Sequence, residues 1–299
     1  MAQKLNKKFK KLNETPEERE LILAKIRQSC LMDDAYMKIF FDGEIECTQL
    51  VLRIIMERDD LIVISSKAQQ NFYGASGKHS IRLDIYATDS EGRYYDIEIQ
   101  RASSGAAPER ARFCSALLDA NMLEKNQNYK DLRESVVIFI TEHDVLGGNK
   151  PLYKIDRYID GEILFNDGSK IIYVNGEHQD AETALGKLIH DFMCINAEEM
   201  YYPPLASRAR IVKGNKEGED SMKSVWDEMQ EESFAKGMAE GEKKGMAKGE
   251  KKGEKRGEKK MQEGIVITML KAGKLALDEI AEYSGLKLSR VKELAKTLA

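Results

Sequence analysis

Acidic side chains gather on two short segments of the chain that have the pattern of neighbouring β-strands. Residues 81–87 and 94–101 both alternate apolar with polar side chains, and the segment between them has the composition of a turn. A turn centred on Glu91 sets Asp84 opposite Glu98 in an antiparallel pair. Facing carboxylates repel, and a divalent cation that takes oxygen ligands relieves the repulsion. The spacing therefore predicts a magnesium or manganese site.

The same register sets Arg82 opposite Gln100 and Tyr86 opposite Asp96. A second interpretation stays open, because hairpins with one apolar and one charged face are common and Arg82 could neutralise either acid. A change of register by one residue would also separate the two carboxylates. The pattern alone leaves a metal site and a solvated strand face as alternatives.

Asp84, a following turn and Glu98-Ile-Gln100 resemble the Asp…Glu-x-Lys core of the PD-(D/E)xK nuclease superfamily. The resemblance is to its Glu-x-Gln branch, the recombination-promoting nuclease (Rpn) or PD-(D/E)xK transposase-like family. It covers roughly residues 30–260. Other similar stretches are residues 82–89, 96–101, 109–112, 137–142 and a charged glycine-repeat tail.

The resemblance implies an Mg²⁺- or Mn²⁺-dependent DNA endonuclease with a transposase-like or recombination-promoting role. It implies that Asp84, Glu98 and the backbone carbonyl of Ile99 hold the metal. Gln100 would complete the catalytic set at the position of the superfamily's lysine, and Leu83 replaces the proline of the signature. An amide can orient a water but cannot act as a base near neutral pH. We therefore expect activity to depend strongly on the metal.

Two acids and two arginines are further candidates for places near the site. Asp34 or Glu46 resembles the extra acid that many superfamily members contribute to the metal shell, although each also suits a solvated helix position. Arg110 and Arg112 open the helix after the hairpin and could clamp phosphates. Surface ion pairs are the alternative for these arginines.

The remaining pattern is that of an α/β fold. The resemblance implies a restriction-endonuclease-like core, which is a mixed central sheet flanked by helices. Apolar periodicity predicts helices over 16–28, 33–58, 108–124 and 181–194, and strands over 61–64, 135–141, 153–159 and 170–174.

The tail is low in complexity, with glycine at every fourth residue from Gly237 to Gly257. Residues 236–260 hold ten basic and five acidic side chains, a local net charge of +5. One interpretation is a long, solvated and frayed charged helix or linker, since each interior glycine costs ~1 kcal/mol relative to alanine. The other is a helix whose glycine stripe allows self-association or whose basic face lies along DNA.

The last segment has the spacing of a helix-turn-helix, with Ala281, Gly285 and Val291 at the packing and turn positions. Residues 288–296 are the expected recognition helix. An ordinary helical hairpin used for packing or dimerisation is an equal alternative. The expected DNA contacts of this helix are Arg290, Lys292 and Lys296.

These patterns divide the chain into four parts. We expect an N-terminal helical arm over 1–30 and a nuclease-like domain over 31–205. A charged glycine-repeat helix or linker follows over 206–262, and a small helix-turn-helix-like end over 263–299.

The composition limits the classes of partner. The 299 residues carry a net charge of −4, so DNA binding would need locally concentrated positive charge. No apolar run of ~18 residues predicts a membrane span, and no signal peptide is expected. Four cysteines without zinc or disulfide spacing favour a reducing cytoplasmic location.

The sequence therefore leaves two functions open. The first is a metal-dependent DNA endonuclease, which would favour a homodimer or higher oligomer if it cuts both strands of a duplex. The second is a catalytically inactive DNA-binding or oligomerisation protein that uses the basic tail and the helix-turn-helix.

Overall fold

The computed structural model describes residues 16–72, 81–123, 125–214 and 216–298. The chain divides into two compact units, one up to residue 229 and the other from residue 230 to the end.

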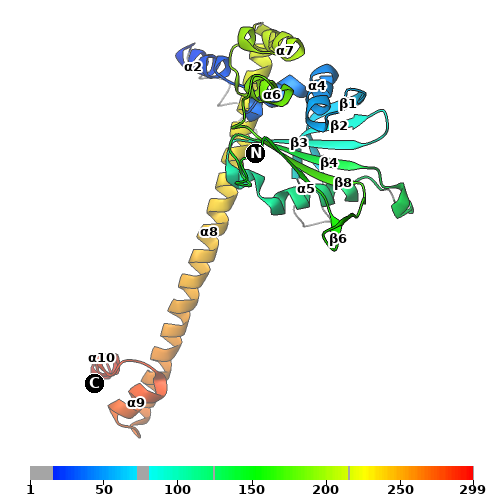
Figure 1. Ribbon diagram of the computed structural model, residues 1–299. Helices are drawn as coiled ribbons and strands as arrows, with labels where there is room; N and C mark the ends of the chain where they lie inside the picture. The colour runs from blue at the N-terminus through cyan, green and yellow to red at the C-terminus, as the bar shows by residue number, and fades with distance from the viewer. Residues whose placement is uncertain (1–15, 73–80, 124, 215, 299) are drawn as a thin grey trace. The chain divides into compact units, whose positions relative to one another are not determined.

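A mixed sheet of six strands forms the centre of the first unit, in the order β1-β2-β3-β4-β8-β5 (Figure 1). β1, β2 and β3 pair antiparallel, β3, β4 and β8 pair parallel, and β5 returns antiparallel to β8. A separate pair, β6 and β7, forms a small hairpin. The strands are β1 (Val63–Phe72), β2 (Ile81–Asp89), β3 (Tyr94–Gln100), β4 (Ser135–Thr141), β5 (Leu152–Ile155), β6 (Tyr158–Ile159), β7 (Ile163–Leu164) and β8 (Ser169–Asn175).

Helices cover both faces of this sheet, which confirms the expected restriction-endonuclease-like α/β fold. The helices of the first unit are α2 (Pro16–Arg27), α3 (Asp34–Phe41), α4 (Ile45–Met56), α5 (Pro108–Ala120), α6 (Ala184–Met193), α7 (Pro203–Gly214) and the start of α8 (Lys216–Ala272). Short 3₁₀ turns are Ser103–Ala106, Tyr129–Asp131 and Ala197–Glu199. Figure 1 shows α4 and α6 on one side of the sheet and α5 on the other.

One hydrophobic cluster lies on each face of the sheet. β4 is buried along its whole length, as its run of β-branched and aromatic residues predicts for a central parallel strand. Its Val136, Ile138 and Ile140 enter the larger cluster, together with side chains of α3, α4, α6 and α7. Val137 and Phe139 enter the smaller cluster, beneath α5. The site described below lies on the α5 side.

One predicted helix was wrong. The single helix expected over 33–58 is two helices, α3 and α4, because the chain turns between Phe41 and Ile45. Gly43 has a φ of 70°, a conformation that glycine adopts without steric cost and that ends α3. Asp34 and Glu46 therefore open two different helices.

Other boundaries also differ from the prediction. The strand expected over 61–64 runs on to Phe72, because β1 pairs with the full length of β2. The strand expected over 153–159 is split into β5 and β6, and the helix expected to reach residue 124 ends at Ala120. The hairpin, β4 and β8 lie where the alternation placed them.

The larger cluster draws on segments at both ends of the first unit. Leu23 and Ile26 of α2 are buried in it, as are Leu205 and Val212 of α7 and Met222 of α8. The core of this unit thus includes side chains before residue 31 and beyond residue 205.

The second unit ends in two short helices, α9 (Leu277–Ser284) and α10 (Leu288–Lys296). Val266 of α8 packs with Ile280, Val291 and Leu294 in a small cluster of its own. Gly285 joins the helices with a φ of 69°, the conformation expected at this turn. α10 has the bounds predicted for the recognition helix.

The glycine repeat lies within α8, which continues without a break to Ala272. All residues from 237 to 260 are exposed. A Cβ built on any of the repeat glycines would meet nothing within 4 Å, so the described residues place no neighbour against this stripe.

Candidate active site

The hairpin of β2 and β3 has the register that the sequence predicted. Ile85 pairs with Ile97, Tyr86 with Asp96, and the pairs continue to the turn. Gly92 closes that turn with a φ of 78° and an N–H that donates to the Asp89 carbonyl oxygen (3.0 Å). The tight turn therefore fixes which residues of the two strands face each other.

The ladder between these strands ends at Ile85 and Ile97, before it reaches Asp84. The expected backbone pairs of Asp84 with Glu98 and of Arg82 with Gln100 are thus not formed. The even alternation expected along β2 also fails at this point, since Leu83 packs in the smaller cluster and Ile85 in the larger. The backbone changes face at Asp84.

Side chains replace the missing ladder. The Ile99 backbone N–H donates to Asp84 Oδ2 (2.9 Å), and the Asp84 backbone N–H donates to Glu98 Oε1 (3.4 Å). Each acid therefore contacts the backbone of the opposite strand, and the two carboxylates lie together. On the other side of Asp84, Gln69 of β1 has a φ of 54°, which is uncommon for a residue with a side chain.

Arg110 holds the Glu98 carboxylate from the first turn of α5. Its Nη2 donates to Glu98 Oε2 at 2.5 Å, and its Nη1 donates to the Gly105 carbonyl oxygen at 3.0 Å. Glu98 is 0% exposed, whereas the arginine side chain is 35% exposed. Burial disfavours the charged form of a carboxylate, and a hydrogen bond from a guanidinium stabilises that form by supplying an opposite charge.

The pKa values of both carboxyl groups are raised, chiefly by burial. Burial is the main cause that raises the pKa of Asp84, and the charge of Glu98 raises it further, while the Ile99 N–H opposes the shift. Burial also raises the pKa of Glu98, and Arg110 opposes that shift. A cation placed between these groups would favour their ionised forms, so the donor set suits a divalent metal.

Gln100 lies at the end of β3, over a backbone that only glycine allows it to approach. A Cβ built on Gly105 would stand 2.1 Å from Gln100 Oε1 and 3.1 Å from its Cδ. The half-buried amide therefore rests in a cradle formed by the 3₁₀ turn that precedes α5. The Gly105 carbonyl oxygen of this turn also accepts a hydrogen bond from Arg110, which in turn holds Glu98. The same segment therefore positions both Gln100 and Glu98.

Comparison with known families agrees with this geometry. Residues 50–190 match the family model of the PD-(D/E)XK nuclease family transposases. This segment is similar to that nuclease family. The match spans β2, β3 and α5, and so includes Asp84, Glu98 and Gln100. No curated protein and no solved structure matches the chain at a significant level.

The two candidates for an extra acid differ in position. Asp34, exposed at the start of α3, lies near enough to the nuclease site for its charge to raise the pKa of both Asp84 and Glu98. Its own pKa is raised by burial of the carboxyl group and by Asp33, and lowered by Arg82. Glu46 is exposed in the first turn of α4 and has no such effect on the site carboxylates.

The predicted DNA contacts also differ from one another. Arg110 is part of the carboxylate cluster, and Arg112 is exposed on α5. In the second unit, Lys292 and Lys296 are exposed on α10. Arg290 is held by two acids, since its guanidinium lies 2.8 Å from Glu263 and 2.7 Å from Glu293.

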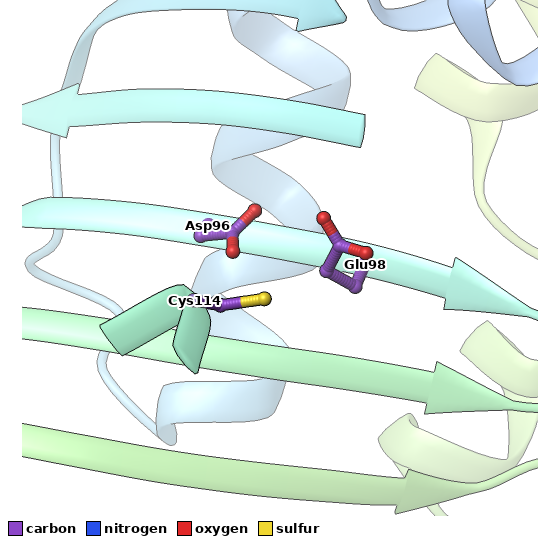
Figure 2. Close-up of side chains that lie close together, drawn as sticks. All are labelled: Asp96, Glu98 and Cys114. Atoms are coloured by element: carbon purple, nitrogen blue, oxygen red, sulfur yellow. The ribbon is translucent and has the colours of Figure 1, made fainter. Parts of the chain in front are cut away.

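Two neighbours of the nuclease site were missed from the sequence. Asp96 and Glu98 project from the same face of β3, and Cys114 of α5 points toward them (Figure 2). The alternation of β3 placed Asp96 beside Glu98, so its position was available from the pattern. Cys114 was not, because nothing in its spacing from the other cysteines shows which helix face meets the sheet.

Arg101, which follows Gln100, was also missed. Its guanidinium lies 3.2 Å from Asp33 and 3.4 Å from Glu142, and Nη2 lies 3.1 Å from Cys30 Sγ. It connects the end of β3 with the segment before α3, and its charge lowers the pKa of Asp34.

Among the described residues, no helix is both long and apolar enough to cross a bilayer.

Proposed function

We propose that the chain is a magnesium-dependent DNA endonuclease with a transposase-like or recombination-promoting role. The observation that carries the proposal is the reciprocal contact of Asp84 and Glu98, in which each acid meets the backbone of the opposite strand. It sets two carboxylates side by side within a nuclease-family domain. Mg²⁺ or Mn²⁺ would be held there by Asp84, Glu98 and the Ile99 carbonyl.

The cation, when bound, would supply a Lewis acid that offsets charge on the scissile phosphate and lowers the pKa of a water. Gln100 would orient the attacking water through its amide, and it has no charge with which to act as a base. Arg110 favours the ionised form of Glu98 and holds its carboxylate in place, so that Glu98 would offer this carboxylate without rearrangement. Water would attack phosphorus directly while the P–O bond to one strand end breaks. The attacking water would lose a proton to solvent, and the departing oxygen would take one from solvent, so no covalent enzyme intermediate is needed.

Asp34 would complete the metal shell from α3, since it is the extra acid whose charge acts on both carboxylates. Arg112 would contact a phosphate from the exposed side of α5. The exposed basic residues of α8, with Lys292 and Lys296 of α10, would hold the flanking DNA backbone. Cutting of both strands by one site per chain would favour a dimer.

Nicking of supercoiled plasmid in the presence of Mg²⁺ tests the proposal. Asp84→Asn and Glu98→Gln keep the side-chain shapes and should each abolish nicking, because each removes a metal ligand. Glu46→Gln is the matched control, since Glu46 is exposed on α4 and away from the site. Circular dichroism of each variant should match that of the parent chain.

Substitution of Gln100 separates two roles for the amide. Gln100→Ala should lower the nicking rate by about 10²-fold, the usual scale for a lost orienting group. Gln100→Lys restores the superfamily's lysine and should retain activity. Equal loss in both variants would indicate that Gln100 acts only by packing on Gly105.

The competing function is DNA binding without cleavage, through α8 and α10. Slower migration of DNA in a gel with the parent chain, without nicking in either Mg²⁺ or Mn²⁺, would favour it.

A cytoplasmic location is part of our proposal, because the four cysteines are all free and buried, which suits a reducing compartment.

A further inference from the structure

We propose that Asp96, Glu98 and Cys114 form a second cation site, which takes a thiophilic divalent ion such as Zn²⁺. One carboxylate oxygen from each acid and the Cys114 Sγ all lie within 4.8 Å of one another. The acids come from β3 and the thiol from α5, and the side chains point toward one another (Figure 2). The site does not depend on nuclease activity.

The decisive residue is Asp96. Its side chain is 0% exposed, and among the described residues neither of its carboxylate oxygens has a hydrogen-bond partner. Buried polar atoms nearly always have partners, and a carboxylate without one is costly. Glu98 already accepts from Arg110, so Asp96 is the acid of this cluster that lacks a partner, and a cation bound between Asp96, Glu98 and Cys114 would supply one.

The charges in this region leave room for such an ion. Arg110 contacts Glu98, Gly105 and the Cys114 thiol, while the oxygens of Asp96 receive no donor in the described part of the chain. The Tyr86 backbone pairs with Asp96 in the ladder, so the strand itself holds this carboxylate in place. Burial of Glu98 and Cys114, both 0% exposed, also excludes competing water.

The donor set distinguishes this site from the one at Asp84. Two carboxylate oxygens and a thiolate suit Zn²⁺ or Co²⁺ better than Mg²⁺ or Mn²⁺, which prefer oxygen ligands. Ligands bound to one Zn²⁺ at ~2.0–2.3 Å lie roughly 3–4 Å apart, so small side-chain rotations would bring these atoms into place. Binding converts the thiol to a Zn²⁺-bound thiolate and releases its proton to solvent.

Glu98 belongs to both sets of ligands. Carboxylates commonly bridge two cations ~3.5–4 Å apart in enzymes that act on phosphates. The inner ion would then fix the Glu98 side chain together with Cys114 of α5, while Asp84 would bind the outer ion. Its role would be to position Glu98.

Cobalt titration of the chelator-stripped full-length chain tests the proposal. Co²⁺ replaces Zn²⁺ and reports a thiolate ligand by a charge-transfer absorption in the near ultraviolet. We expect this absorption to saturate at one Co²⁺ per chain, to disappear on addition of Zn²⁺, and to persist in excess Mg²⁺. A folded parent chain that gives no thiolate absorption overturns the proposal.

Variants identify the ligands. Cys114→Ser should abolish the absorption, and Asp96→Asn, which keeps the thiol, should weaken Co²⁺ binding by at least about tenfold. Cys47→Ser is the matched control, because Cys47 is equally buried but lies in α4. Absorption retained in Cys114→Ser, or unchanged affinity in Asp96→Asn, would also overturn the assignment.

Asp84→Asn separates this proposal from the proposed nuclease function. It removes an outer ligand and should abolish nicking, while the cobalt absorption remains. If the parent chain fails to nick DNA yet shows the absorption, the nuclease proposal fails and the inner site stands. The reverse result leaves a nuclease without a thiolate-bound ion.

Discussion

At the scale of single residues, Gly105 has an effect on the site that its own chemistry does not predict. Gly105→Ala would place a methyl group where Gln100 Oε1 now lies, 2.1 Å from the new Cβ. The flexible end of Gln100 can move away, so the stability cost should stay below about 1 kcal/mol. Nicking should fall by about tenfold or more, because the amide loses its position.

The control for this change is Gly241→Ala, whose added Cβ meets nothing within 4 Å. It should leave the nicking rate unchanged. Rates and thermal unfolding of both variants decide the matter, and normal nicking by Gly105→Ala would contradict a positional role for Gln100.

The paired acids also set a dependence of stability on pH. The unfolded chain releases its Asp84 proton near pH ~3.9, whereas burial and Glu98 raise the pKa of Asp84 in the folded chain. Between these two values the folded state binds the additional proton, so stability falls as the pH rises through the raised pKa. The metal-free chain should therefore melt at a lower temperature at pH ~8 than at pH ~5.

Addition of Mg²⁺ should raise the melting temperature more at the higher pH, since the cation favours the ionised carboxylates. Asp84→Asn should flatten both responses. Melting curves in EDTA and in Mg²⁺ at the two pH values measure the effect, and a metal-free chain that becomes more stable with rising pH would refute it.

The sequence predicted the register of the hairpin from its turn to the pair of Ile85 with Ile97, because the turn fixes which residues face each other there. It did not show that the ladder stops at Ile85, since that depends on side chains replacing backbone donors and acceptors. The position of Cys114 could not be predicted from the sequence for a related reason. Its approach to β3 depends on how α5 is rotated against the sheet.

At the scale of elements, strong local patterns were predictable. The bounds of β4 and α10 match the sequence prediction, because one is a continuous β-branched run and the other follows a glycine turn. The break between α3 and α4 was missed, since apolar spacing continues across Gly43 and only the positive φ there ends the helix. Apolar periodicity predicts which face of a helix is buried, but it predicts the position of a turn between two helices less well.

The glycine-repeat part of α8 should exchange its amide hydrogens quickly. Residues 237–260 are exposed, and each interior glycine costs ~1 kcal/mol relative to alanine without a compensating contact. Hydrogen exchange measured by mass spectrometry should show early labelling there and late labelling in β4. Protection that grows with protein concentration would instead reveal self-association along the stripe.

At the scale of the whole molecule, the two compact units should unfold separately. Ile280→Ala removes a buried side chain from the small cluster around α9 and α10 and should destabilise that unit by about 2–4 kcal/mol. Calorimetry should show a lower first transition and an unchanged second one. Ile138→Ala, in the larger cluster, should have the converse effect, and a single transition shifted by both would show that the units are coupled.

Salt dependence can show which basic surface touches DNA. Each lost phosphate contact lowers the slope of log K against log salt by ~0.9. Lys251→Gln with Lys252→Gln tests α8, and Lys292→Gln with Lys296→Gln tests α10. We expect both pairs to lower the slope by up to about 2, and an unchanged slope for either pair would remove that surface from the interface.

Glu98 meets Arg110, the Asp84 backbone and the pair formed by Asp96 and Cys114. Substitution of Glu98 cannot show how much each contact contributes, because it disturbs every partner at once. The free-energy changes of the separate contacts then do not add. Double-mutant cycles should therefore vary Asp84 together with Cys114 and leave Glu98 intact. A coupling energy near zero in that cycle would mean that the two ends of the junction work independently.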